Sequence, residues 1–166
     1  MLVAEKGKAA YTGRFASLME LYENNYLLIR LLIPELRQLG EGTYVSIVPG
    51  ALDLQLSSIE HCRYTTTFNL TYRFENSLRQ PFEPNLTIRL YHDARTAEVV
   101  TGLVQTQRAQ TRRTRGLDNS WRLNRFLYKW MRYCLHQGHS FEVAAPHETT
   151  GTLHRESDAT AVNPSV

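Results

Sequence analysis

Apolar residues between positions 13 and 33 recur at steps of three and four, which is the spacing of one face of an amphipathic helix. Pro34 ends this pattern because proline lacks an amide hydrogen and clashes with the preceding turn. A short helical turn is predicted over residues 34–39. A second amphipathic pattern covers residues 121–137 and ends at Gly138. The sequence therefore predicts one helix in each half of the chain.

Between these helices, apolar and polar residues alternate with the period of a half-buried strand. Within residues 85–100, Leu86, Ile88 and Leu90 share one face, and a polar turn at residues 92–95 separates two strands. Further strands are predicted at residues 44–48, 52–57, 64–75 and 103–107.

The order of helix, run of strands and helix indicates an α+β fold. We predict an antiparallel sheet of about five to six strands with the N-terminal and the C-terminal helix packed on one face, where both apolar helix faces are buried. Length and composition fit one soluble domain, since the chain has 166 residues, of which 42% are hydrophobic and 21% charged. The expected division is a loose lead-in at residues 1–12, one domain at 13–142 and a polar, disordered tail at 143–166.

Two cysteines, Cys62 and Cys134, are too few for a disulfide framework. The N-terminal residues lack the apolar segment of a signal peptide. The most apolar run, residues 26–33, contains Arg30 and is far shorter than the roughly 20 residues of a membrane span. We therefore expect a cytoplasmic protein with no membrane partner.

Four blocks of the chain resemble the uncharacterised bacterial YqiB-like proteins, a family defined by a domain of unknown function. The blocks are residues 21–26 (LYENNY), 63–66 (RYTT), 88–94 (IRLYHDA) with 97–99 (AEV), and 124–127 (NRFL) with 130–135 (WMRYCL). The resemblance runs over most of the chain and implies a small cytoplasmic bacterial protein. It implies no activity, cofactor or catalytic residue.

The positive charge is concentrated in one segment. Eight basic residues and one acidic residue lie between Arg108 and Arg132, a local charge of +7, which leaves −4 for the rest of a chain whose net charge is +3. Such a block favours an anionic partner, nucleic acid or a nucleotide-like ligand, and the alternative is a solvated helix face. The candidate polyanion-binding residues are Arg112, Arg113, Arg115, Arg122, Arg125, Lys129 and Arg132.

A second candidate site surrounds the predicted hairpin turn. Two arginines, a histidine and two carboxylates would suit a small anion or nucleotide, or acid–base chemistry, because histidine titrates near neutral pH. The alternative is structural: Arg89 and Glu98 would pair across the hairpin and Asp93 would hold the turn. The candidate ligand-binding residues are Arg63, Tyr64, Arg89, Tyr91, His92, Asp93 and Glu98.

No spacing of His, Cys, Asp or Glu matches a zinc or calcium pattern, and no phosphate loop or nucleophile motif occurs. We expect no metal, no cofactor and no identifiable catalytic residue. The leading hypothesis is a non-enzymatic binding or regulatory module for an anionic partner. The alternatives are a small enzyme that uses the hairpin-turn cluster and an adaptor that binds another protein through an exposed sheet face.

Overall fold

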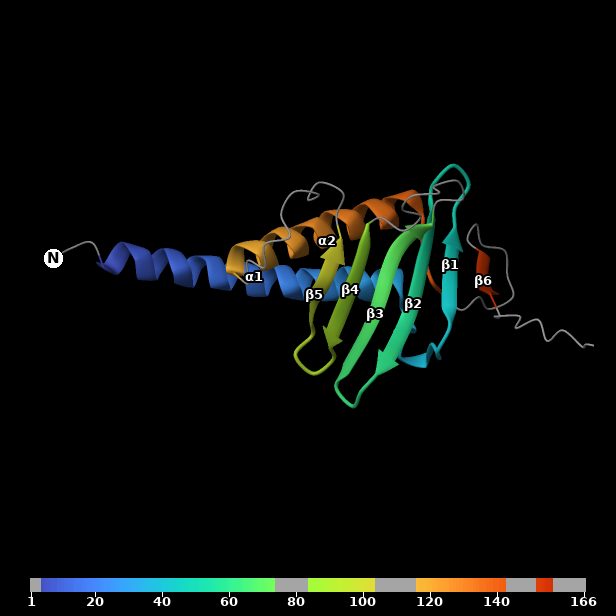
Figure 1. Cartoon of the computed structure of the whole chain (residues 1–166), viewed down its shortest axis with the longest axis horizontal. Helices are drawn as coiled ribbons and strands as arrows, with labels where there is room; N and C mark the ends of the chain where they lie inside the picture. Colours follow the sequence, from blue (N-terminus) through green and yellow to red (C-terminus); the bar gives the residue numbers. More distant parts are fainter. Residues whose placement is uncertain (1–3, 74–83, 104–115, 143–151, 157–166) are drawn as a thin grey trace, which may run out of the picture.

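The computed structural model describes residues 4–73, 84–103, 116–142 and 152–156 and shows an α+β arrangement (Figure 1). An antiparallel sheet forms one layer, and helices α1 and α2 lie side by side behind it. The predicted fold class is confirmed. The elements in chain order are α1 Ala4–Leu32, the 3-10 helix η1 Leu36–Gln38, β1 Thr43–Ile47, β2 Asp53–His61, β3 Thr65–Arg73, β4 Asn85–Tyr91, β5 Thr96–Leu103, α2 Leu117–Gln137 and β6 Thr152–Glu156.

The sheet has the strand order β5-β4-β3-β2-β1-β6, and every neighbouring pair is antiparallel. Strands β1 to β5 follow one another as a meander, as expected for short connections between antiparallel strands. The hairpin predicted from residues 85–100 is present, with Arg89 directly opposite Glu98. The strand predicted at 103–107 contributes only Leu103, the last residue of β5, and residues 104–107 lie outside the described part.

Two elements lie in segments for which the sequence predicted no order. Helix α1 begins at Ala4 rather than at residue 13. Its first residues include Ala, Glu and Lys, which favour helix even where no apolar face needs burial. Strand β6 lies within residues 143–166 and pairs with β1. A strand edge offers main-chain donors and acceptors, so a polar segment can pair with it without an apolar face. The predicted division into lead-in, domain and tail otherwise stays a prediction.

The core lies between one face of the sheet and the two helices. Phe68 and Leu70 of β3 and Ile88 of β4 are completely buried on this face. Their neighbours on the opposite face, such as Asn69 and Thr87, are only half-buried. This alternation follows from the two-residue period of a strand, and it confirms the predicted core face.

Trp130 joins α2 to the sheet. Its side chain is 5% exposed, and its ring meets the ring of Tyr72 on β3 edge to face, with 5.3 Å between centroids. Phe126, one turn earlier, lies 5.9 Å away. Aromatic rings prefer such tilted contacts. Trp130 therefore packs between the C-terminal helix and the sheet.

The two helices run in the same direction, as Figure 1 shows. Asn25 of α1 donates to the main-chain oxygen of Asn124 on α2 at 3.2 Å. Further along both helices, the amide of Phe141 donates to the carbonyl of Leu32 at 2.8 Å. Helix α2 ends at Gly138, whose left-handed φ of 95° is readily adopted by glycine. The chain therefore turns sharply back toward α1 and the sheet.

Candidate functional site

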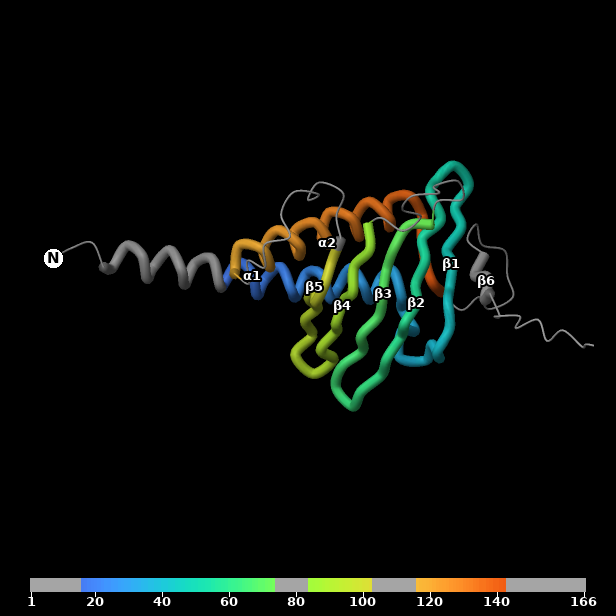
Figure 2. Tube along the Cα trace, viewed as in Figure 1, coloured from blue at the N-terminus to red at the C-terminus, as the bar shows by residue number. Residues whose placement is uncertain are grey.

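Two turns and η1 meet at one end of the sheet, here named the turn end (Figure 2). The turn between β2 and β3 holds Arg63 and Tyr64, and the turn between β4 and β5 begins with His92. The amide of His92 donates to the carbonyl of Tyr64 at 2.9 Å, which joins the two turns. From η1, Arg37 donates through one terminal nitrogen to the carbonyl of Arg63 at 3.3 Å.

A continuous chain of hydrogen bonds crosses the turn end. Nε2 of His61 lies 2.8 Å from the carbonyl oxygen of Leu39, and Nδ1 of the same ring lies 3.0 Å from Oγ1 of Thr66. This hydroxyl oxygen also lies 2.7 Å from Nε2 of His92. Thr66 is 1% exposed, so its hydroxyl is held between the two imidazole rings rather than by water.

The direction of these bonds follows from the chemistry of the atoms. The carbonyl of Leu39 only accepts, so Nε2 of His61 carries a hydrogen. In the neutral ring, Nδ1 of His61 then accepts the hydroxyl hydrogen of Thr66. The Thr66 oxygen is left to accept from Nε2–H of His92. Neutral His92 consequently presents an unprotonated Nδ1, for which no partner is seen among the residues that the structure describes.

The surroundings of His92 are electropositive. Its pKa lies below the ordinary value of 6.5, first because partial burial disfavours the charged ring, and then because of the positive charge of Arg37 and Arg30 and the nearby His61 ring. Asp93 acts in the opposite direction. Its Oδ1 already accepts the amide of Ala94 at 2.9 Å, so this carboxylate also shapes the turn, as the structural interpretation expected.

The predicted ligand-binding residues divide into two groups. The first group lies at the turn end and consists of Arg63, Tyr64, His92 and Asp93. Within it, the guanidinium of Arg63 lies 5.0 Å from the centroid of the Tyr64 ring. The second group lies within the strands, with Arg89 and Tyr91 in β4 and Glu98 in β5. Four of the seven residues therefore converge at the turn end, whereas β4 and β5 carry the other three along the sheet face.

On that face Glu98 accepts a hydrogen bond from the Tyr91 hydroxyl at 2.7 Å. The Arg89 Nε instead donates to Oγ1 of Thr67 at 3.2 Å, although Glu98 is its register partner. Bonding to Glu98 raises the pKa of Tyr91, and burial followed by the Glu98 charge raises that of Tyr22 on α1. The Glu98 carboxylate therefore influences one tyrosine of β4 and one of α1.

Sequence reasoning missed four residues of the turn end, namely Arg30, Arg37, His61 and Thr66. They come from α1, η1, β2 and β3, so no spacing along the chain groups them. The place of His61 also depends on an irregularity in β2, where Ser58 adopts a φ of 52° and the register with β3 shifts. The one available signal was Thr66, a polar residue on the alternating core face of β3.

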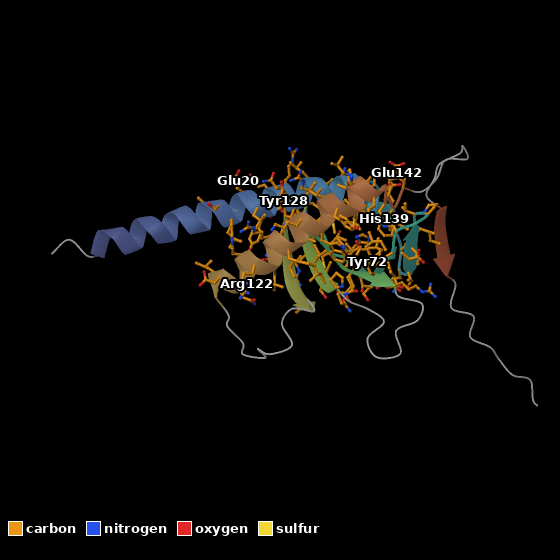
Figure 3. The ribbon with its side chains drawn as sticks, turned by 90° about the horizontal axis from the view of Figure 1, so that it is seen from above. Glu20, Tyr72, Arg122, Tyr128, His139 and Glu142 are labelled. Carbon is orange, nitrogen blue, oxygen red and sulfur yellow. The ribbon has the colours of Figure 1, made fainter. Side chains whose placement is uncertain are left out.

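The basic residues of α2 form an exposed row, here named the α2 row, which consists of Arg122, Arg125, Lys129 and Arg132. The Arg132 guanidinium lies 5.6 Å from the centroid of the Tyr128 ring. Figure 3 shows Arg122 near the start of α2, Tyr128 farther along it and His139 just beyond its end. Arg112, Arg113 and Arg115 lie outside the described residues.

The two histidines near the end of α2 differ in burial. His136 is exposed, whereas His139 is 2% exposed, with Nδ1 3.0 Å from the Ser46 hydroxyl. Across the described ranges, no three His, Cys, Asp or Glu side chains are grouped so as to hold a metal ion. No helix within those ranges is long and apolar enough to cross a membrane.

Comparison with known proteins gives the family. The model of a family described as "Protein of unknown function (DUF1249)" matches residues 28–140. The chain belongs to this family. It is similar to the "Uncharacterized protein YqiB" of Escherichia coli strains K12 and O157:H7, with 33% identity over 134 residues, which cover 77% of this chain and 93% of the relative. No solved structure matches the chain.

The sequence blocks that resemble this DUF1249 family occupy two structural positions. Residues 63–66 and 88–94 meet at the turn end and contain Thr66 and His92. The blocks at 21–26 and 124–127 meet where Asn25 contacts Asn124. One pair of blocks therefore builds the hydrogen-bonded turn end, and the other holds the helices together.

Proposed function

We propose that this member of the DUF1249 family is a non-enzymatic binding module for single-stranded nucleic acid, with the α2 row as its contact surface. The observation that carries the proposal is the exposure of all four basic side chains of the row on one helix. Between residues 121 and 137 this helix has no acidic residue that would offset their charge. Like charges one turn apart destabilise a helix by a few tenths of a kcal/mol per pair, and a polyanion would relieve that repulsion.

The length of the row suits several phosphates. Its first and last members are ten residues apart, which is about 15 Å along a helix. Arginine binds phosphate through two parallel hydrogen bonds, and three of the four members are arginines. The sequence before α2 contains Arg112, Arg113 and Arg115. These residues would add contacts to phosphates of the same nucleic-acid strand.

Aromatic side chains next to the row favour a single strand over a duplex. Tyr133 is 54% exposed, and Tyr128 lies beneath the guanidinium of Arg132. Bases of a single strand stack on such rings, whereas bases within a duplex present only their edges. The ligand class that fits best is therefore single-stranded RNA or DNA, without sequence preference.

The test is a salt titration of binding to a fluorescent single-stranded oligonucleotide, followed by anisotropy. The log of affinity should fall linearly with log salt, with a slope of roughly −0.7 per phosphate contact. Replacing Arg122, Arg125 and Lys129 with Gln should flatten the slope by about two units, since three contacts are lost. A thermal melt of the variant should match that of the wild type, because all three side chains are exposed.

The matched control compares the single variants Arg95→Gln and Lys129→Gln. Both residues are exposed, and each replacement removes one positive charge, from the β4–β5 turn in the control and from the α2 row in Lys129→Gln. The control should keep the wild-type slope. Equal loss of binding in both variants would show an effect of net charge alone, and no binding by the wild type at low salt would contradict the proposal.

The proposed location is a cytoplasm or another reducing compartment, where such a nucleic-acid partner is present. Cys62 and Cys134 are both free, and Cys62 is exposed. An exposed thiol persists most readily where thiols are kept reduced. Cell fractionation, with detection of the tagged protein in the cytoplasmic fraction, would test this placement.

A further inference from the structure

We propose that the turn end is a binding site for a phosphate group, in which Nδ1 of His92 and the guanidinium group of Arg37 contact the ligand. This site is separate from the α2 row and does not depend on the proposed nucleic-acid binding. It uses the chain of hydrogen bonds from Leu39 to His92 to fix the direction of the histidine ring.

The first argument is the surplus of donors. Arg37 uses one of its five N–H groups for the carbonyl of Arg63. Within the described part of the chain, Arg30, Arg37 and Arg63 form no ion pair with a carboxylate. All three side chains are exposed, so their guanidinium groups are accessible to a ligand. Positive groups without a counterion attract anions, and guanidinium matches the oxygens of a phosphate.

The second argument is the fixed histidine. Because the Thr66 hydroxyl holds Nε2 of His92, rotation of the half-buried imidazole would break a hydrogen bond to a hydroxyl that is itself buried. The other nitrogen, Nδ1, is therefore held in a constant direction. Protonation at Nδ1 leaves the whole chain of hydrogen bonds intact, whereas protonation of His61 would require the Thr66 hydroxyl to reverse.

Both arguments predict that phosphate binding and proton uptake are coupled. The groups around His92 are Arg30 of α1, Arg37 of η1, His61 of β2, Arg63 and Tyr64 of the β2–β3 turn, and Asp93 of its own turn. The cations among them disfavour a proton on His92. A bound phosphate would offset their charge and accept a hydrogen bond from Nδ1–H. Phosphate should therefore raise the pKa of His92, and it should bind more tightly at lower pH.

The experiment follows the C2–H NMR signal of His92 during a pH titration, with the assignment made from its loss in His92→Gln. Titrations are recorded with inorganic phosphate, with glycerol phosphate and with sodium chloride at equal ionic strength. Either phosphate compound should raise the midpoint by about one unit beyond the chloride sample. A larger effect of glycerol phosphate would identify a phosphomonoester ligand, and a larger effect of inorganic phosphate would identify the free ion.

Variants separate this site from general charge effects. Arg37→Gln should raise the His92 midpoint in chloride, because a neighbouring cation is lost, and it should remove the response to phosphate. Arg30→Gln, at an exposed helix position, should act the same way more weakly. Arg95→Gln is the matched control, since it removes one exposed cation from the same β4–β5 turn and should leave both midpoints unchanged.

A pair of Thr66 variants tests the histidine orientation. Thr66→Ser keeps the hydroxyl and should keep the phosphate response, whereas Thr66→Val has the same shape without the hydroxyl and should lose it. An equal midpoint in phosphate and chloride would overturn the proposed site. A full phosphate response in Arg37→Gln would overturn the assignment of its guanidinium, and an equal response in both Thr66 variants would overturn the role of the hydroxyl.

Discussion

The side-chain oxygen of Asn124 accepts the main-chain amide hydrogen of Val99 at 3.0 Å. Val99 lies on β5, the edge strand of the sheet, next to a register irregularity. An edge strand has amides with no partner strand, and an unpaired buried amide is costly. The side chain of a completely buried residue on α2 supplies the missing acceptor. Asn25 of α1 donates to the main-chain oxygen of the same residue, which joins three elements at one point.

Replacing this acceptor should loosen the edge of the sheet. We expect Asn124→Ala to lower the free energy of unfolding by about 1–3 kcal/mol, the usual cost of leaving a buried polar group unpaired. The measurements are urea unfolding and amide hydrogen exchange, in which the Val99 amide should exchange faster. Asn24→Ala, at a half-buried position on α1, is the control. Unchanged exchange at Val99 would contradict the assigned role.

Truncation of Trp130 should be among the most destabilising single changes. The indole contacts Tyr72 and Phe126 and is 5% exposed, so Trp130→Ala leaves a cavity between α2 and the sheet. We expect a loss of about 3–5 kcal/mol in the free energy of unfolding. Tyr133→Ala, at a position that is 54% exposed, should change it by less than about 0.5 kcal/mol. Similar values for both variants would place Trp130 outside the core.

Stability should fall as the solution is acidified below neutrality. Burial places the pKa of His139 below its ordinary value of 6.5. The unfolded chain therefore takes up a proton at a higher pH than the folded chain does. The stability that neutral His139 contributes is fully present above about pH 6.5. It is lost as the pH falls toward the pKa of His139 in the folded protein. His92 acts in the same direction.

Thermal melts across this pH range check the effect. His139→Gln should be less stable than the wild type at neutral pH, because the contact with Ser46 is altered, but its melting temperature should decline less on acidification. His136→Gln, at an exposed position on α2, should follow the wild-type decline. A parallel decline in the wild type and His139→Gln would exclude His139 as a source of the acid sensitivity.

The two cysteines should differ strongly in reactivity. Cys62 is exposed, whereas Cys134 is buried and its pKa is raised to about 11 by that burial. The thiolate is the reactive form, so a maleimide at neutral pH should modify Cys62 alone in the folded protein. Mass spectrometry of the labelled peptides should detect Cys134 labelling only in denaturant. Rapid labelling of Cys134 without denaturant would show that α2 separates from the sheet.

The open sheet face and four residues of the turn end could be predicted from the sequence, but the chain of hydrogen bonds across the turn end could not. The alternation from Leu86 to Tyr91 places Arg89 and Tyr91 on the polar face, and β4 shows that arrangement. At the turn end, Leu39, His61 and His92 come from separate segments of the chain. The Leu39 carbonyl bonds His61, and the His61 and His92 rings both bond the Thr66 hydroxyl. The sequence also suggested pairing of Arg89 with Glu98, yet each bonds a different neighbour.

The sequence by itself determined the two helices, the meander of strands, the faces that are buried and the row of cations on α2. All of these follow from local periods of 3.6 or two residues, which need no knowledge of distant contacts. Tertiary structure alone decided that β6 pairs with β1, that Asn124 covers the edge of β5, and that two histidines share the Thr66 hydroxyl. Those contacts depend on which elements become neighbours and on small register shifts, because a hydrogen bond is made or lost over less than one ångström.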